Sequence, residues 1–97
     1  MDFTLPTVHF LKTHPHPFNA IWTGLKLFEW RKNDRGYKVG DHLVLQEYNP
    51  DTQAYTGYEI ECEVIYLLEW GFGIPEGYCI MSINVLDWDE PSEKEKD

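Results

Sequence analysis

The chain has no Lys or Arg between Val39 and Leu86, although it carries eight such residues among its 97 positions. Acidic residues outnumber basic ones by 17 to 8, and the formal net charge at pH 7 is −9. Sequence-independent binding to duplex nucleic acid depends on a broad basic face that neutralises phosphates. So acidic a chain argues against that function, but it permits a small, focused binding site.

Long apolar runs and closely spaced metal ligands are also missing. No stretch approaches the roughly 20 apolar residues that a membrane-spanning helix needs, and residues 1–6 do not resemble a secretory signal. We therefore expect a cytoplasmic protein that does not bind membranes. The two cysteines, Cys62 and Cys79, are predicted to be free buried thiols. Neither they nor the four histidines have partners at ligand spacing, so we expect no metal and no cofactor.

The positive charge that is present is concentrated in one short window. Five of the eight basic residues lie between Gly24 and Lys38, where only two acidic residues accompany them. An acidic chain that gathers its basic residues in this way is predicted to bind its partner there. That partner should be anionic, or polar and planar.

The hydrophobic pattern predicts five strands and one short helix. Phe18, Ile21 and Trp22 recur at helical spacing, Pro17 suits a first helical position, and Gly24 suits the position just past the end. The strands are expected at 7–12, 27–32, 42–48, 59–68 and 78–86.

These elements indicate a mainly β fold with one or two short helices, arranged as a small, mostly antiparallel β-barrel. We expect one domain over residues 1–88. The acidic tail, 89–97, is predicted to be disordered because it is charged and has few hydrophobic residues.

The second predicted strand carries the main candidate site. Phe28 and Trp30 alternate with Glu29 and Arg31, so each pair shares a face. We expect the aromatic pair to face the core and the charged pair to face a surface or a cleft. Lys26, just before the strand, would complete a set that clamps a ligand with both donors and acceptors. The alternative is a structural ion pair on a solvated face, worth only about 0–1 kcal/mol.

The turn that follows would form the rim of such a cleft. Lys32, Arg35 and Lys38 add positive charge, and a planar Arg can stack on a base or grip a phosphate. A charged hairpin turn that only aids solubility is the alternative. Tyr37 is expected in the core or at the rim.

The order of these parts resembles the ASCH domains of the PUA-like superfamily. In those domains a short helix ends in Gly-x-Lys, the next strand carries x-x-Glu-x-Arg, and a Gly-Asp turn precedes another strand. Stretches 9–12, 31–35 and 45–48 look like a subgroup of small, uncharacterised bacterial and phage proteins in that branch. The resemblance covers about residues 8–86. The matching motif consists of Gly24, Lys26, Glu29, Arg31, Gly40 and Asp41.

The resemblance implies a PUA-like (ASCH) β-barrel with a helix beside a cleft that faces RNA or a nucleotide. Our first hypothesis is therefore a module that binds single-stranded or structured RNA, or a nucleotide or nucleoside. Glu29 would accept a hydrogen bond from a base or orient Arg31. The expected binding residues are Lys26, Glu29, Arg31, Lys32, Arg35 and Lys38.

Two alternatives remain open. Some small relatives of this kind are amidohydrolases that act on an acylated cytidine with a Lys, a Thr three residues later and a distant Glu. Lys26 matches and would be the base or nucleophile, with Glu29 as a proton shuttle. Glu29 stands where the Thr would be, however, and the distant acid has no identifiable counterpart, so this hypothesis ranks second. The other alternative is a protein-interaction or regulatory module with a vestigial cleft.

Overall fold

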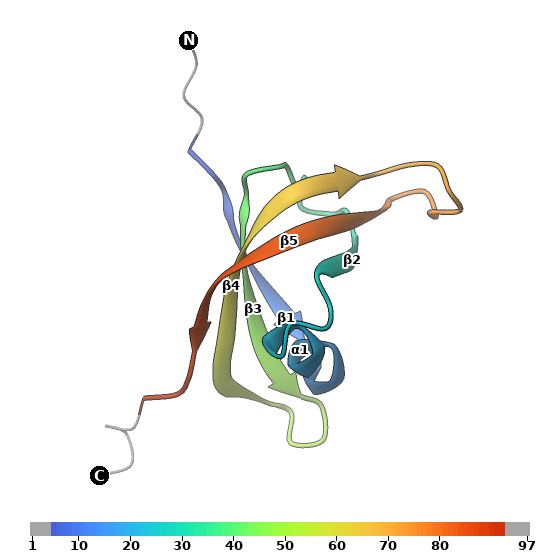
Figure 1. The fold of residues 1–97 in the computed structure, drawn as a ribbon. Helices are drawn as coiled ribbons and strands as arrows, with labels where there is room; N and C mark the ends of the chain where they lie inside the picture. Colours follow the sequence, from blue (N-terminus) through green and yellow to red (C-terminus); the bar gives the residue numbers. More distant parts are fainter. Residues whose placement is uncertain (1–4, 93–97) are drawn as a thin grey trace.

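A computed structural model describes residues 5–92 and shows a curled, five-stranded half-barrel with one short helix (Figure 1). The mainly β fold expected from the sequence is thereby confirmed. Among the described residues, no helix is long and apolar enough to cross a membrane. In chain order the elements are β1 (Val8–Thr13), α1 (Pro15–Trp22), β2 (Phe28–Lys32), β3 (His42–Asn49), β4 (Ala54–Leu68) and β5 (Tyr78–Asp89).

The strand order β1-β3-β4-β5-β2 leaves β1 and β2 as the two edges of the sheet. Strands β1 and β3 are parallel, and the other three pairs are antiparallel. Two register shifts interrupt the β4–β5 pairing, and such bulges bend and twist a strand pair. The resulting curl brings the two edges toward each other. We call the boundary between β1 and β2 the seam.

The core lies on the concave side of the sheet. In β4, Ile60, Cys62 and Val64 are fully buried, while the glutamates between them are partly exposed. This agrees with the alternation of acidic and apolar residues from Glu59 to Val64 in the sequence. Both cysteines are free and buried, as expected. Burial raises the pKa of Cys62 to about 12, so this thiol stays protonated at neutral pH.

Helix α1 packs on the concave side near one end of the seam (Figure 1). It begins at Pro15, two positions before the predicted start, because Pro15 and Pro17 both fit a first turn whose N–H groups need no partner. Phe18 and Ile21 are buried against the sheet.

The chain leaves α1 through a tight reversal at Gly24. Gly24 has a φ of 82°, a conformation that glycine adopts without strain. The N–H groups of Leu25 and Lys26 both donate to the carbonyl oxygen of Ala20, at 2.8 and 2.9 Å. This reversal sets Lys26 at the start of β2.

The last two strands are longer than the sequence suggested. β4 begins at Ala54, and β5 continues to Asp89, the first residue of the expected tail. A side chain at Gly57 would meet Pro91 at 3.0 Å, so the chain also passes close to β4 beyond the end of β5. Residues 93–97 of that predicted tail lie outside the described residues.

Candidate functional site at the seam

The alternation predicted for β2 is present, and the charged pair lines a cleft, but the aromatic pair does not face the core. Phe28 and Trp30 are 45% and 47% exposed, whereas Glu29 is only 3% exposed. Glu29 and Arg31 pair across the sheet with two fully buried β5 residues, so they share the concave side. The expectation that the aromatic pair faces the core was therefore wrong. A charged row can face the interior here because its charges compensate one another.

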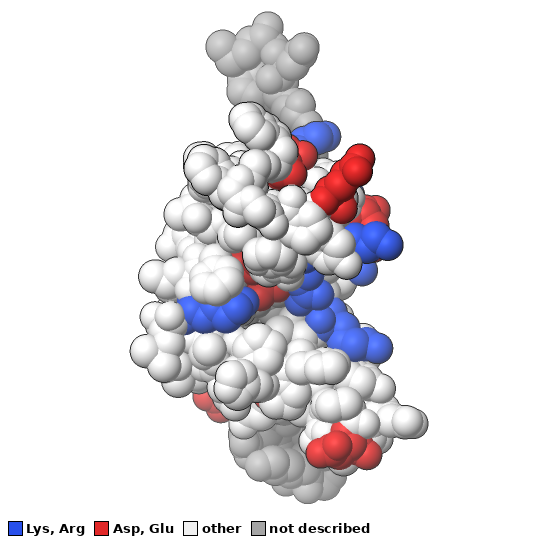
Figure 2. All heavy atoms as spheres, turned by 90° about the vertical axis from the view of Figure 1, so that its right-hand side faces the viewer, with Lys and Arg blue, Asp and Glu red and all other residues white. Residues whose placement is uncertain are grey.

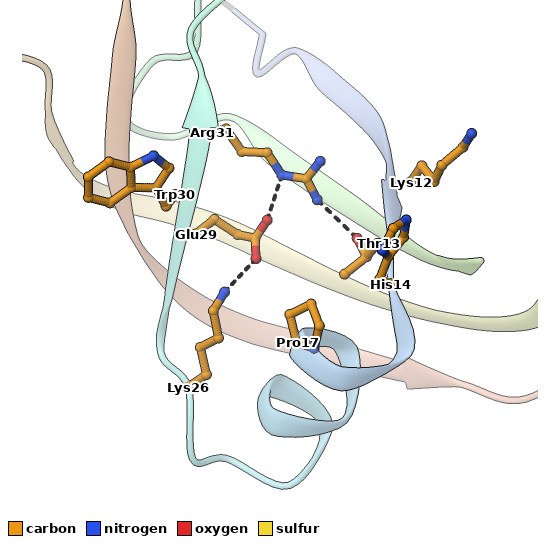
Figure 3. A pocket seen from close by; sticks show the side chains of 8 residues that line it. All are labelled: Lys12, Thr13, His14, Pro17, Lys26, Glu29, Trp30 and Arg31. Carbon is orange, nitrogen blue, oxygen red and sulfur yellow. Dashed lines mark hydrogen bonds and ion pairs between the residues drawn. The ribbon is translucent and has the colours of Figure 1, made fainter. Parts of the chain in front are cut away.

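Glu29 is held between two cations (Figure 3). Its Oε1 lies 2.8 Å from Lys26 Nζ, and its Oε2 lies 2.7 Å from Arg31 Nε. The side chains of Lys26 and Arg31 are 21% and 24% exposed. Lys26 Nζ also donates to the carbonyl oxygen of Phe28 at 2.7 Å and lies over the Phe28 ring. A carboxylate with both oxygens engaged by charged donors holds those donors in place.

The same network bridges the seam. Arg31 Nη2 donates to Thr13 Oγ1 at 3.1 Å, and Thr13 Oγ1 donates in turn to the carbonyl oxygen of Leu11. Further along, Arg35 Nη1 donates to the carbonyl oxygen of Phe10 at 2.9 Å. Arg31 thus connects the two edge strands, which lie at opposite ends of the sheet order, and Arg35 connects the turn after β2 to β1.

A cleft of about 370 Å³ opens where β2 faces the end of β1 and the start of α1. This volume falls near the lower limit of small-ligand pockets, which span about 300–1,000 Å³. Lys26, Glu29 and Arg31 point toward one another across it, while Lys12 and Trp30 point outward from its rim (Figure 3). Its lining comprises Lys12, Thr13, His14, Pro17, Lys26, Glu29, Trp30 and Arg31.

The predicted basic residues do not all reach this cleft. Lys26 and Arg31 line it with Glu29, but Arg35 lies farther along the seam and Lys32 is not part of the lining. Lys38 lines a different hollow, together with residues 39–41. Figure 2 shows the molecule from the right-hand side of Figure 1. On that face, Lys and Arg side chains gather across the middle, with acidic side chains between them.

The β1 side of the cleft was not predicted. Lys12, Thr13 and His14 come from the end of β1, and Pro17 comes from α1. Nothing in their own pattern points to a site, because they reach β2 only through the curl of the sheet. The exposure of Trp30 was missed for a different reason, since its apolar character favoured a core position.

The Gly40-Asp41 turn of the motif lies away from the cleft and is a structural element. Asp41 Oδ2 accepts hydrogen bonds from His9 Nε2 at 2.9 Å and from the Lys38 N–H at 3.0 Å, and Oδ1 accepts one from the Thr7 N–H. Burial by itself raises the pKa of Asp41, but these hydrogen bonds outweigh it and hold the pKa below its usual value. Tyr37 is buried edge-to-face against His9, so it belongs to the core.

Within residues 5–92, no group of three or more His, Cys, Asp or Glu side chains is arranged to hold a metal ion. The cleft itself is lined mainly by charged and polar side chains. It presents two cations around one carboxylate, which leaves a local excess of one positive charge, with a hydroxyl from Thr13 at the edge.

The fold and this site define a small half-barrel domain with a charged cleft at its seam. The chain belongs to the family described as "Domain of unknown function (DUF3850)", whose model matches residues 8–83. It is also similar to an Escherichia phage P2 protein named "Uncharacterized 12.9 kDa protein in GpA 3'region". The two are 35% identical over 57 residues, which make up 59% of this chain and 50% of that protein. The matched segment thus spans about half the length of this relative.

Proposed function

We propose that the protein binds single-stranded RNA or a nucleotide in the cleft at the seam. The observation that carries this proposal is the buried Glu29 with its two fixed cations, which face an open cleft rather than bulk solvent. Prepositioned cations lose little freedom when an anionic ligand binds.

Arg31 is the best-placed donor for a ligand. It uses Nε for Glu29 and one Nη2 hydrogen for Thr13. Within the described part of the chain, no buried side-chain nitrogen or oxygen lacks a partner, so Nη1 of Arg31, which has no hydrogen bond, is exposed to solvent. A planar guanidinium with free N–H groups matches a phosphate or the acceptor edge of a base. Glu29 is then the residue that orients Arg31.

The rim offers surfaces on which bases could stack. Trp30 and Phe28 lie exposed side by side on the convex side of β2, and Trp30 also lines the cleft. Proteins that bind single strands combine aromatic stacking surfaces with a basic groove. Lys32, two residues after Trp30 on β2, adds positive charge beside these rings, whereas Lys12 lies across the cleft on β1 with its Nζ over the Tyr48 ring.

The proposal includes a place among the PUA-like domains of the ASCH type. The Gly-x-Lys-x-x-Glu-x-Arg motif supports it, because Lys26, Glu29 and Arg31 of that motif form the ion-paired cluster. The curled β-sheet with a helix beside a cleft supports it as well. A binding function argued from resemblance alone is an analogy, so the site geometry is the stronger support.

The alternatives gain no comparable support. Lys26 Nζ already donates to the Glu29 carboxylate and to the Phe28 carbonyl oxygen, so it is held in an ion pair rather than presented to a substrate as a base or nucleophile would be. A vestigial cleft would leave Lys26, Glu29 and Arg31 facing away from any cavity, whereas all three line one.

The test is fluorescence anisotropy with labelled oligonucleotides of about eight nucleotides, a length within the usual site sizes of single-strand binders. We expect salt-sensitive binding at low ionic strength. Arg31→Ala should weaken it by about tenfold or more, since a charge-assisted contact is worth roughly 1.5–3 kcal/mol.

Arg31→Lys is the companion variant, because it keeps a positive charge beside Glu29 but lacks the planar fork. We expect it to fold and to bind severalfold more weakly than the wild type. Glu76→Gln, an exposed change outside the cleft lining, is the matched control. Wild-type affinity in the folded Arg31 variants, or no binding to any RNA or nucleotide at low ionic strength, would overturn the proposal.

A further inference from the structure

A second cavity, of about 350 Å³, lies against α1 and is lined by none of the residues that line the seam cleft. The helix separates the two: Pro17 lines the seam cleft, and the next residue, Phe18, lines the second cavity. We call this second cavity the aromatic pocket. Its lining comprises Phe18, Asn19, Trp22, Glu47, Tyr58 and Glu90.

Aromatic rings form the walls of this pocket. The Trp22 and Tyr58 rings are nearly perpendicular, at 81°, with centroids 5.6 Å apart. Phe18 lies behind Trp22 at 5.9 Å and is buried, so the arrangement is anchored in the core. Trp88 Nε1 donates to the carbonyl oxygen of Trp22 at 3.1 Å and fixes the end of α1 to β5.

Two carboxylates complete the lining, and no Lys or Arg belongs to it. Glu47 stands at an unexpected place. Leu43 and Leu45 of β3 are fully buried, and alternation would place another apolar residue at the next position of that row. A partly exposed acid stands there instead, and it shares the lining of the aromatic pocket with Phe18.

The backbone around Glu47 is irregular. The register between β3 and β4 shifts between Gln46 and Tyr48, and such bulges re-aim a side chain. Thr56 Oγ1 donates to Glu47 Oε1 at 2.8 Å. A neutral hydroxyl orients the carboxylate, and no Lys or Arg in the pocket lining forms an ion pair with it.

We propose that the aromatic pocket binds an alkylammonium group, the chemistry shared by a methylated lysine side chain and by choline. Ring faces attract such cations, and a nearby carboxylate adds a Coulomb attraction. Methylation favours binding because it weakens the hydration of the ammonium, which is strong in an unmodified lysine. The proposal is independent of the function proposed for the seam cleft.

The pocket also excludes the ligand class proposed for the seam. A phosphate would meet Glu47 and Glu90 with no cation to offset them, at a cost that rises in the low dielectric beside buried rings. The two cavities are thus expected to take ligands of opposite charge.

The direct test is a titration followed by tryptophan fluorescence and by indole N–H shifts in NMR spectra. The probes are tetramethylammonium, choline, Nε-trimethyllysine amide, lysine amide and 3,3-dimethylbutan-1-ol, the uncharged isostere of choline. We expect saturable shifts of the Trp22 indole with the methylated cations, and binding at least about fivefold weaker for lysine amide and for the neutral alcohol. A preference between choline and trimethyllysine amide will distinguish a small-molecule source from a peptide source.

Three variants complete the test. Tyr58→Leu removes one aromatic wall at a residue that is 38% exposed, so the fold should survive, and binding should fall by about fivefold or more. Tyr58→Phe keeps the ring and should bind as the wild type does. Glu47→Gln should weaken binding severalfold, whereas the exposed Glu76→Gln should not change it.

Three results would overturn the proposal: equal affinity for choline and its uncharged isostere, no saturable shift with any methylated cation, or unchanged binding in folded Tyr58→Leu. RNA binding at the seam should persist in Tyr58→Leu and Glu47→Gln. Failure of one proposal is therefore distinguishable from failure of the other.

Discussion

Helix α1 has a hollow on each side, and the two hollows differ in how their carboxylates are held. In the seam cleft, Glu29 is buried and both of its oxygens contact cations. In the aromatic pocket, Glu47 is partly exposed and receives a hydrogen bond from the neutral hydroxyl of Thr56.

The partners of a carboxylate therefore set the net charge of the cavity in which it lies. Glu29 is outnumbered by its own cations, so the seam cleft presents a positive excess even though an acid lies at its centre. No Lys or Arg in the pocket lining offsets Glu47, so the aromatic pocket presents a negative charge. One small, acidic chain can therefore offer two sites of opposite preference.

The largest expected effect is on the free energy of unfolding, which should fall much more when Glu29 is replaced than when Glu47 is replaced. Glu29→Gln leaves two partly buried cations without their counter-charge and should lower the free energy of unfolding by about 3 kcal/mol. Glu47→Gln replaces a partly exposed group and should change it by no more than about 0.5 kcal/mol. Urea unfolding followed by circular dichroism measures both. Equal losses of unfolding free energy in the two variants would contradict the difference drawn between Glu29 and Glu47.

A third carboxylate, Asp41, extends the comparison to pH. Its pKa in the folded protein lies below the ordinary value of 3.8, so its stabilising contribution is complete above that value and is lost as the pH falls through the folded pKa. Asp41→Asn should cost about 1–3 kcal/mol at neutral pH, because three hydrogen bonds lose their charged acceptor.

As the pH falls from 5 to 2, Asp41→Asn should lose less stability than the wild type does. The urea concentration at the unfolding midpoint, determined at each pH, measures this loss. Parallel profiles for the two proteins would contradict the role assigned to Asp41. Glu76→Gln provides the reference for an exposed carboxylate.

The smallest expected effect is on RNA binding, and it concerns two lysines. The sequence predicts Lys38 as a binding residue, whereas the structure places Lys12 at the seam cleft. Lys12 lines the seam cleft, whereas Lys38 lines another hollow. Lys12→Ala should weaken RNA binding by about two- to fivefold and reduce the slope of log affinity against log salt by roughly 0.7, the single-strand value for one phosphate contact. Lys38→Ala should leave both quantities unchanged. The reverse result would favour a site nearer the 33–41 turn.

Much of the fold was readable from local patterns. Pro17 and Gly24 bracket the helix to within two residues, because each has a backbone geometry that suits one helix end. The alternation around Ile60 and Val64 correctly identified the core row of β4. The ends of β4 and β5 were missed because pairing extends both strands beyond their hydrophobic runs.

Only part of the candidate site could be predicted from the sequence. Its motif correctly placed Lys26, Glu29 and Arg31 together, since residues two apart on a strand share a face. These three residues line a cleft, but Phe28 and Trp30 were wrongly expected in the core, because alternation groups residues without saying which group is inside.

Local sequence patterns are enough to locate the strands, the helix and the clustering of charge around β2, since these depend on neighbours along the chain. The burial of Glu29, the contact of Thr13 with Arg31 across the seam and the position of Glu47 beside Trp22 and Tyr58 depend on the folded sheet. These contacts join segments far apart in the chain, and they form because a bulged, curled sheet brings its two edges together around one helix.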